Sequence, residues 1–199
     1  VTGLVGSEMC IRDSYWFLLE HFMNISKITE SLKGHDQRFP PVEKWNPELC
    51  NGHEFLIDRE GNWFYDGSAI KNIKLMNLFA SVLKKEGDSY YLVTPIEKIF
   101  VKTDLAPYKI IDFEIVDDNI KLITNLNYDF FLDEDHVSRL VKYEESYVPL
   151  VIVRNNIEGF INRNTYYKLV DLAISQNHKE DNYLYLRSFN INHVIGKIA

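Results

Sequence analysis

Two stripes of apolar side chains at helical spacing constrain the fold of this chain most. The first stripe consists of Leu75, Leu78, Phe79, Val82 and Leu83. The spacing i, i+3, i+4, i+7, i+8 places all five on one face of an α-helix. Asn72 or Ser68 can cap the start of this helix, and Gly87 stands where a left-handed residue often ends one. The apolar face must pack on another element, so we expect a sheet beside it.

Strands are predicted on both sides of this helix. Residues 55–57 and 62–65 are rich in aromatic and branched side chains, which suit a pleated, half-buried surface. Gly61 between them can take the positive φ that a short hairpin loop requires. Residues 90–94 and 96–101 follow the helix and predict two further strands.

The second part of the chain repeats this plan. A second stripe consists of Tyr166, Leu169, Val170, Ala173 and Ile174, again at i, i+3, i+4, i+7 and i+8. Asn164 can cap this second helix. Residues 147–153 and 157–161 predict a hairpin before it, and residues 183–187 and 191–195 predict strands after it.

Between these units, residues 109–116 alternate apolar and acidic side chains and predict a half-buried strand that residues 120–126 pair with. A turn near residues 104–108 separates the two units. We therefore predict an α+β protein of two small roll-like halves, each with antiparallel strands and one packed helix. The expected domains are a mainly-β amino-terminal roll at 25–104 and an α+β carboxy-terminal roll at 105–199.

The first 24 residues fit nothing that follows them. Residues 4–13 resemble translated sequencing-adapter read-through, so we interpret residues 1–24 as a non-native or disordered leader and exclude them from the fold. Residues 25–34 are a candidate for a short helix.

Composition narrows the function. The formal net charge of −7 gives no general attraction to phosphate backbones, and no run of Lys or Arg supplies a local one, so we expect no nucleic-acid partner. No apolar run approaches the ~20 residues that span a bilayer, so we expect no membrane partner. The two cysteines, Cys10 and Cys50, form neither a disulfide framework nor a Cys-x-x-Cys metal site. These features favour a cytoplasmic protein.

Several short motifs are distinctive. The most specific are Pro40-Pro41-Val42, Trp45-Asn46-Pro47 and residues 58–70, 78–88 and 91–98. Together they resemble the uncharacterised bacterial family catalogued as domain of unknown function 1285, and the resemblance covers roughly residue 25 to the end. It implies a two-part α+β protein with a mostly β first roll. It implies no known activity, so no catalytic residue can be carried over.

Residues 133–136 form an acidic segment that ends in a histidine. Its carboxylates could hold a hard cation such as Ca²⁺ or Mg²⁺. The segment lacks the spaced oxygen ligands and the glycine of a dedicated calcium site, so we interpret it as a solvated acidic turn. No nucleotide-binding or nucleophile motif is present in the sequence. We therefore predict no metal site and no cofactor.

A second group of residues is a candidate ligand site. It consists of Trp45, Asn46, His53, Trp63 and Tyr65. If the proline-rich segment folds over the first hairpin, these side chains could line a cleft with polar groups at its rim. The alternative, which large aromatic side chains favour, is a loop that Trp45 anchors to the core with Trp63 inside.

No catalytic group stands out, whereas aromatic surface is plentiful. We therefore predict a non-enzymatic ligand- or protein-binding, regulatory module. The alternative is a small-molecule enzyme whose site lies between the halves and uses His53 or His136 with a nearby carboxylate. A histidine within hydrogen-bond reach of a carboxylate in that cleft would favour the enzyme. A homodimer built on an exposed sheet edge or aromatic patch is a further hypothesis.

Overall fold

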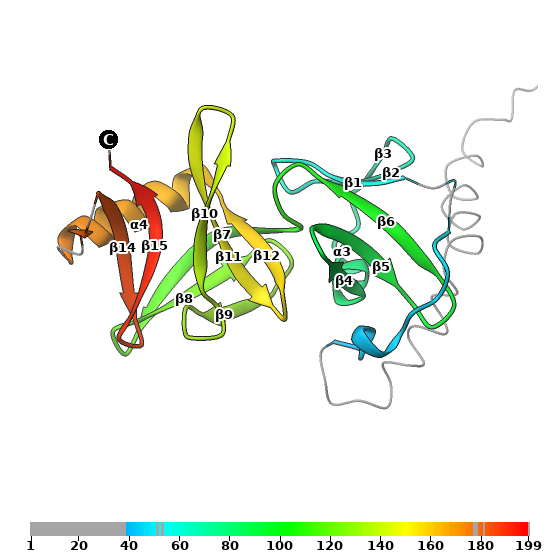
Figure 1. Ribbon diagram of the computed structural model, residues 1–199, viewed down its shortest axis with the longest axis horizontal. Coiled ribbons are helices and arrows are strands. Elements are labelled where there is room, and N and C mark those ends of the chain that lie inside the picture. The colour runs from blue at the N-terminus through cyan, green and yellow to red at the C-terminus, as the bar shows by residue number, and fades with distance from the viewer. Residues whose placement is uncertain (1–38, 51, 53, 177–178, 181, 199) are drawn as a thin grey trace, which may run out of the picture.

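The computed structural model describes residues 39–50, 52, 54–176, 179–180 and 182–198. Two halves lie side by side along the long axis, and each has a curved sheet and one α-helix (Figure 1). Each half has a six-stranded, mostly antiparallel sheet, and a three-stranded sheet completes the second half. This arrangement confirms the predicted α+β class. The predicted leader and the helix candidate at 25–34 lie outside the described residues.

The first half starts with residues 39–50, which we call the strap, and continues into its sheet. Its elements are η1 (Val42–Lys44), β1 (Phe55–Ile57), β2 (Trp63–Tyr65), β3 (Ser68–Ile70), α3 (Ile73–Ser81), β4 (Leu83–Glu86), β5 (Ser89–Val93) and β6 (Lys98–Thr103). The strand order is β3-β2-β1-β6-β5-β4, with β1 and β6 parallel at the centre. The strap is tied to this sheet, because the backbone N–H of Cys50 donates to the carbonyl oxygen of Lys98 at 2.7 Å.

Of the two predicted caps, Asn72 begins α3. Its Oδ1 accepts from the backbone N–H groups of Lys74 and Leu75 at 3.0 and 3.4 Å. Ser68 instead opens β3, a strand that the sequence analysis missed. It follows a two-residue turn at 66–67 in which both residues have positive φ, 44° and 77°. An Asp-Gly pair between apolar runs is a strong hairpin signal, and it should have predicted this strand.

The predicted end of α3 is wrong. The helix ends at Ser81, and Leu83 begins β4 instead of completing the helical stripe. Leu83 is fully buried as a strand residue and pairs with Leu92 of β5. Gly87, with φ +59°, lies in the turn between β4 and β5 and does not end a helix.

The second half carries more strands. Its elements are β7 (Tyr108–Val116), β8 (Asn119–Thr124), β9 (Asp129–Phe131), β10 (Ser138–Tyr143), β11 (Ser146–Arg154), β12 (Ile157–Ile161), α4 (Arg163–Ser175), β13 (Lys179–Glu180), β14 (Tyr183–Ser188) and β15 (Ile191–Lys197). The large sheet has the order β10-β11-β12-β7-β8-β9. The predicted hairpins β7–β8 and β11–β12 are confirmed. Strand β10 was missed, because none of its side chains is fully buried and its apolar signal is weak.

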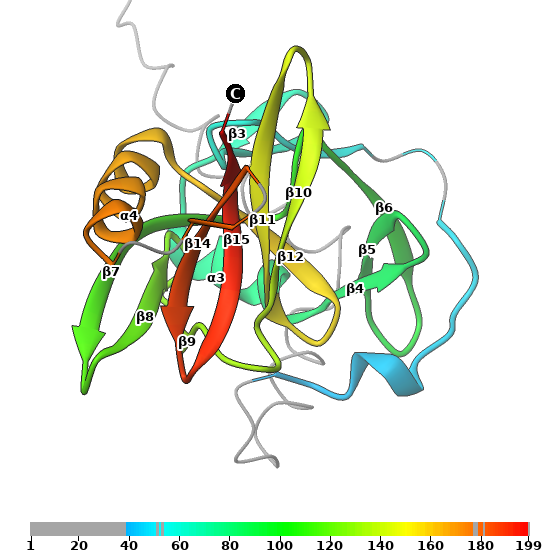
Figure 2. The same ribbon diagram turned by 60° about the vertical axis from the view of Figure 1, so that its left-hand side comes forward.

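Helix α4 packs against β7 and β14 (Figure 2). Its cap is Asn162, whose Oδ1 accepts from the backbone N–H of Thr165 at 2.7 Å. The predicted cap, Asn164, is wrong because it lies inside the first turn. Across the described residues, no helix combines the length and apolar character needed to cross a bilayer.

One hydrophobic core continues from the first half into the second. Its cluster of buried side chains joins Phe55 and Phe79 of the first half to Tyr108 and Leu169 of the second. Trp63 has no exposed surface and stacks on Phe79, with ring centroids 6.3 Å apart. Because apolar packing crosses from one half to the other, it contributes to their relative position.

Replacing Phe79 by alanine should lower the free energy of unfolding by about 3–5 kcal/mol, the usual range for a buried phenylalanine. The ring is only 5% exposed and packs against Phe55 and Trp63. Ile73→Ala on the same helix is the matched control, because Ile73 is 40% exposed; its cost should be about 1 kcal/mol or less. Urea denaturation measures both, and equal costs would contradict a core packed around α3.

Candidate functional site

Arg154, the last residue of β11, reaches across to the end of α3. Its Nη2 donates to the carbonyl oxygens of Ala80, Leu83 and Ser81 at 2.6, 3.0 and 3.4 Å. Its Nε donates to the hydroxyl of Tyr108 at 3.1 Å. The residue is only 5% exposed. A buried cation of the second half is thus held almost entirely by backbone oxygens of the first.

This position suits a guanidinium. The last turn of a helix leaves carbonyl oxygens without partners inside the helix, and the helix dipole places partial negative charge there. The planar guanidinium of Arg154 donates hydrogen bonds to these oxygens and places a positive charge next to the negative end of the helix dipole. The ring of Phe39, at the start of the strap, lies 4.3 Å from its Cζ and makes a cation–π contact. Arg154 therefore joins three segments: the end of α3, the strap and the second sheet.

Glu158 of β12 forms a second contact between the halves. It is 4% exposed and accepts hydrogen bonds from Lys85 at 2.7 Å and from Arg139 at 2.9 Å. Burial acts to raise the pKa of Glu158, but the hydrogen bonds from Arg139 and Lys85 outweigh it, so this pKa lies below its usual range. Burial, followed by the charge of Glu158, raises the pKa of Tyr90. Glu158 is therefore a buried, ionised carboxylate with two cationic partners, and its bond to Lys85 joins the halves at a second point besides Arg154.

The β1–β2 turn makes a third contact. Lys109 Nζ donates to the carbonyl oxygen of Glu60 at 2.7 Å, and Asn125 Nδ2 donates to that of Gly61 at 3.4 Å. A side chain on Gly61 would meet Lys109 Cβ at 3.0 Å, and its φ of +77° disfavours other residues. The close approach of the halves thus requires glycine here.

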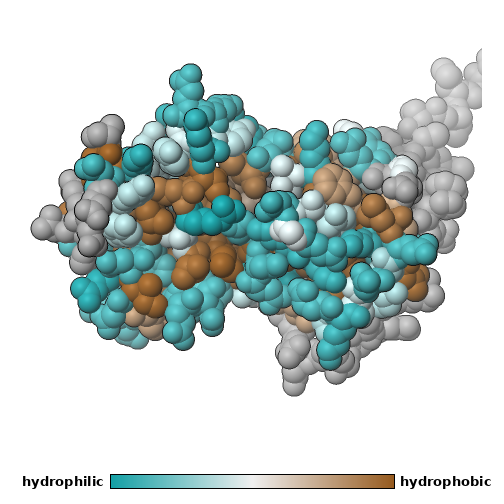
Figure 3. All heavy atoms as spheres, in the orientation of Figure 1, coloured by the Kyte–Doolittle hydropathy of each residue, from teal (hydrophilic) through white to brown (hydrophobic). Residues whose placement is uncertain are grey.

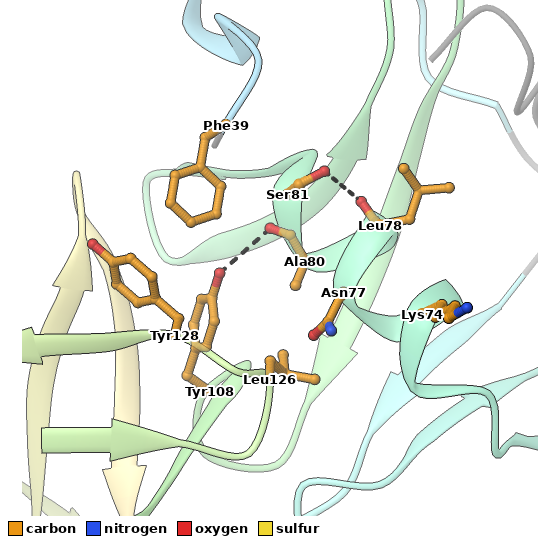
Figure 4. Close-up of a pocket in the computed structure, with 9 residues that line it drawn as sticks. All are labelled: Phe39, Lys74, Asn77, Leu78, Ala80, Ser81, Tyr108, Leu126 and Tyr128. Atoms are coloured by element: carbon orange, nitrogen blue, oxygen red, sulfur yellow. Dashed lines mark hydrogen bonds between the residues drawn. The ribbon is translucent and has the colours of Figure 1, made fainter. Parts of the chain in front are cut away.

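A pocket of about 330 Å³ lies between the halves (Figure 4). It adjoins the Arg154 contact, because Phe39, Ala80 and Tyr108 line the pocket and also contact Arg154. Its walls are formed by Phe39, Lys74, Asn77, Leu78, Ala80, Ser81, Tyr108, Leu126 and Tyr128. They come from the strap, α3, the start of β7 and the β8–β9 turn. The volume is at the lower end of the range for small-molecule sites, and the mostly apolar lining with a few polar groups is typical of them.

Two hydroxyl groups in the pocket wall have hydrogen-bond partners within the protein. Ser81 Oγ donates to the carbonyl oxygen of Leu78 at 2.7 Å, and the Tyr108 hydroxyl accepts from Arg154 and lies 3.5 Å from the carbonyl oxygen of Ala80. Asn77 differs. Its Oδ1 is buried and has no hydrogen-bond partner among the described residues. Its amide points from α3 toward Tyr108 and Leu126 (Figure 4).

None of the four described members of the predicted ligand group lines this pocket. Trp63 is buried in the first-half core, and Tyr65 is half-buried against Phe55, with ring centroids 5.1 Å apart. Trp45 is half-buried on the same core, and its carbonyl oxygen accepts from Lys84 Nζ at 3.0 Å. Asn46 is exposed, and His53 lies outside the described residues. Ligand binding by this group stays a prediction.

The sequence analysis missed the residues that do line the pocket. Asn77 lies between apolar residues of the first helical stripe, and Tyr128 and Leu126 lie in and beside an ordinary turn. The one available signal was Arg154, a charged residue at the end of an otherwise apolar strand. Such a charge is rarely buried without a partner, so it pointed to a contact with another element.

The acidic segment contains a histidine–carboxylate pair. His136 Nδ1 and Asp133 Oδ1 are 2.7 Å apart, and the backbone N–H groups of Asp135 and His136 also donate to that oxygen. Burial acts to raise the pKa of Asp133, but the contacts with His136 outweigh it and lower this pKa. Both residues lie between β9 and β10, and neither lines the pocket. In the described chain no cluster of three or more His, Cys, Asp or Glu side chains could hold a metal ion.

His193 of β15 is the most deeply buried histidine that the structure describes, with 1% of its surface exposed. Neither ring nitrogen has a hydrogen-bond partner among the described residues. Burial lowers the pKa of His193 to about 4 and outweighs the opposing charge of Asp133. The imidazole is therefore neutral in the folded protein at neutral pH.

The visible face of the molecule is mostly hydrophilic (Figure 3). Apolar side chains gather there in small groups, most of them over the second half, and hydrophilic residues separate them. The exposed large apolar residues include Leu49 and Phe100 in the first half and Val137 and Tyr147 in the second. The predicted homodimer stays a hypothesis that light scattering would test.

These features define a class: an α+β protein of two sheet-and-helix halves that share a core and form an open pocket where they meet. Comparison with known protein families agrees with this two-part architecture and also identifies the family. The model described as the N-terminal domain of DUF1285, a domain of unknown function, matches residues 40–106. The model described as the C-terminal domain of DUF1285, a protein of unknown function, matches residues 107–195. The chain therefore belongs to the DUF1285 family, as the sequence motifs indicated.

Two solved structures are similar to this chain. A DUF1285 family protein from Silicibacter pomeroyi DSS-3 has 29% sequence identity and a TM-score of 0.73, over 86% of this chain and 95% of that one. A DUF1285 family protein from Shewanella baltica OS155 has 27% identity and a TM-score of 0.49, over 59% of this chain and 90% of that one. A search of the curated proteins finds no match.

Arg154→Met should lower the free energy of unfolding by about 3 kcal/mol or more, because three buried carbonyl oxygens lose a donor while the methionine keeps much of the packing. Arg163→Met is the matched control: Arg163 is exposed on α4, so its replacement should cost about 0.5 kcal/mol or less. Chemical denaturation measures both changes. Similar small costs would show that the Arg154 contact contributes little.

His193 should make the protein less stable in mild acid. Its pKa falls from 6.5 to about 4 on folding, so below pH 6.5 the unfolded chain binds a proton that the folded chain does not. Stability from this group is complete above pH 6.5 and falls between pH 6.5 and 4. Between pH 7 and 5 the loss should be about 2 kcal/mol. His193→Leu should remove this part of the pH dependence in urea denaturation; an unchanged profile would contradict it.

Proposed function

We propose that this protein is a non-enzymatic ligand-binding module whose site is the pocket between its halves. The observation that carries the proposal is that both halves and the strap build one pocket directly beside the buried Arg154 contact. Small-molecule sites often lie at such junctions. We expect the module to act in the bacterial cytoplasm, where a free thiol such as that of Cys50 stays reduced.

A regulatory role follows from where the ligand would sit. Phe39 and Tyr108 line the pocket and also contact the guanidinium of Arg154. A ligand that packs on these rings would bind best when Arg154 holds the halves in their present arrangement. Its binding free energy would therefore shift the population toward that arrangement. A partner protein could detect the change.

The chemistry of the pocket favours binding over catalysis. The described residues that line it include Ser81 and Tyr108, which are side-chain types that can attack substrates or transfer protons. The Ser81 hydroxyl donates to the carbonyl oxygen of Leu78, and the Tyr108 hydroxyl accepts from Arg154, so neither is bonded to a general base. The His136–Asp133 pair meets the distance requirement for an enzyme but lies in the β9–β10 segment, outside the pocket lining. The inter-half pocket therefore supports the enzyme alternative less well.

A thermal-shift screen against metabolites, nucleotides and divalent metals tests the proposal. A ligand that binds only the folded state raises the melting temperature by mass action, by an amount that grows with concentration. Leu78→Trp should fill the pocket and abolish the shift, because Leu78 forms part of its wall.

Ile73→Trp is the matched control, since Ile73 is exposed on the same helix and does not line the pocket. This variant should keep the full shift. A ligand that stabilises all three proteins equally would place its site elsewhere. If the screen yields no ligand at all, the proposal is overturned, and a module that binds only other proteins takes its place.

A further inference from the structure

We propose that the outer edge of β7, residues 112–116, binds an extended segment of a partner protein as an added antiparallel strand, and that this segment alternates apolar and basic side chains. The site goes beyond the proposed function, because none of these residues lines the pocket. Three observations carry the proposal: backbone groups without partners at this edge, an apolar face that stops at it, and carboxylates that flank it.

The edge is open because β7 extends further than its neighbour β12. Strand β12 pairs with residues 108–110 of β7, whereas β7 continues to Val116. On its other side, β8 pairs with β7 from Asp112 to Val116. The β7–β8 hairpin continues past α4 (Figure 2), and no described strand pairs with the outer edge of β7 beyond residue 110. An extended peptide can add to a free sheet edge of this kind.

Hairpin geometry determines which backbone groups face this edge. The turn at 117–118 has two residues with positive φ, 49° and 64°, and Val116 pairs with Asn119 across it. Residues that flank such a two-residue turn exchange hydrogen bonds with each other. The next pair, Ile115 and Ile120, therefore points its backbone groups away from the hairpin interior, because the two kinds of pair alternate along an antiparallel ladder.

The hydrogen bonds of Ile120 agree with this alternation. Its N–H donates to Ser188 Oγ at 3.0 Å, and its carbonyl oxygen accepts from Leu132 at 2.8 Å, so neither group faces β7. On β7, the N–H and C=O groups of Ile115 and, two residues earlier, of Phe113 must then face the outer edge. Among the described residues, nothing on that side bonds to them. These groups are available to an added strand.

The same edge interrupts an apolar face of the sheet. Phe113 packs against the core, and its β8 partner Leu122 is only 1% exposed, as is Ile120 opposite Ile115. Ile115 itself is 54% exposed at the end of this face. An apolar side chain of an added strand, placed opposite Ile115, would cover it and remove apolar surface from water.

The other face of this edge is acidic. Asp112 and Glu114 alternate with the apolar residues of β7, so both carboxylates point to the opposite face, and both are exposed. Asp112 forms an ion pair with Lys168 of α4 at 3.4 Å. Lys121, opposite Glu114 on β8, forms its ion pair with Asp129 instead. A Lys or Arg side chain of the added strand, placed opposite Glu114, would form a cross-strand pair of opposite charge.

These charges argue against a second copy of this chain as the added strand. Antiparallel pairing that sets Phe113 of one copy opposite Ile115 of the other would place Glu114 directly opposite itself. Like charges directly opposite each other destabilise a sheet. Asp117 and Asp118 add further negative charge at the end of the hairpin. The segment that fits is therefore basic, with apolar side chains opposite Phe113 and Ile115.

Short capped peptides that alternate lysine and valine test the proposal. Isothermal titration should show that the full chain binds such a peptide at least about ten-fold more tightly than one that alternates glutamate and valine, because glutamate would face Glu114. Glu114→Lys should reverse this order of affinity. Glu145→Lys, the same change at an exposed position in the β10–β11 turn, is the control and should keep it. An order that Glu114→Lys leaves unchanged would overturn the proposal.

Backbone methylation separates strand addition from simple charge attraction. In an antiparallel pair, the residues opposite Phe113 and Ile115 exchange both hydrogen bonds with them, so valine N–H groups of the peptide face β7. Methylating the main-chain nitrogens of the valines should abolish binding, and methylating those of the lysines should largely preserve it. Equal binding of the two methylated peptides, or the reverse order, would overturn the proposal.

Ile115→Pro tests the same contact from the side of the protein. Proline removes the outward N–H and leaves the bonds to β8, since the N–H of Ile115 faces away from that strand. This variant should lose the lysine–valine peptide, and Ile115→Thr, which keeps the N–H, should retain it. Light scattering completes the test: a dimer without peptide that Ile115→Pro converts to a monomer would overturn the proposal in favour of a second copy at this edge.

Discussion

The hydrogen bonds from Arg154 to the end of α3 are the interaction on which the rest of this structure depends. They supply donors to carbonyl oxygens of Ala80, Ser81 and Leu83, so the helix can end there and the chain can turn into β4. They also bring β11 against the first half. The ring of Phe39 covers the same guanidinium, which brings the strap over the junction. The pocket exists because these three segments converge on one buried charge.

A buried arginine is stable only when its donors are matched, and here the match lies in the other half of the protein. The arrangement of the halves is therefore specified by chemistry as well as by apolar area. Glu158 makes a similar contact with a negative charge. Its carboxylate on β12 accepts hydrogen bonds from Lys85 of the first half and from Arg139 of the second. In both contacts, a buried charged side chain of the second half is thus bonded in part by groups of the first half.

The local part of this structure could be predicted from the sequence, and the long-range part could not. Both helices and most hairpins follow from periodicity and turn residues, which act over a few positions. Strand β10 is the exception, because its side chains are only partly buried and give a weak apolar signal. The predicted end of α3 was wrong because Leu83 fits the helical stripe and the buried face of a strand equally well. Whether Leu83 belongs to the helix or to a strand depends on its pairing with Leu92 and on its contact with Arg154, 71 residues away. The pocket could not be predicted for the same reason, because it depends on contacts between distant segments. Asn77 and Tyr128 belong to segments whose proximity no spacing reveals. The five aromatic and polar candidates were chosen instead on the expectation that the proline-rich segment folds over the first hairpin.

The central claim is that the contacts of Arg154 and Glu158 make the two halves one cooperative unit. Scanning calorimetry of the unaltered protein and of the Arg154→Met, Glu158→Gln double variant tests it most directly. We expect one transition in the unaltered protein, with calorimetric and van't Hoff enthalpies that agree, and two separable transitions in the double variant. A double variant that still unfolds in a single two-state transition would contradict the claim and assign the coupling of the halves to their shared apolar core.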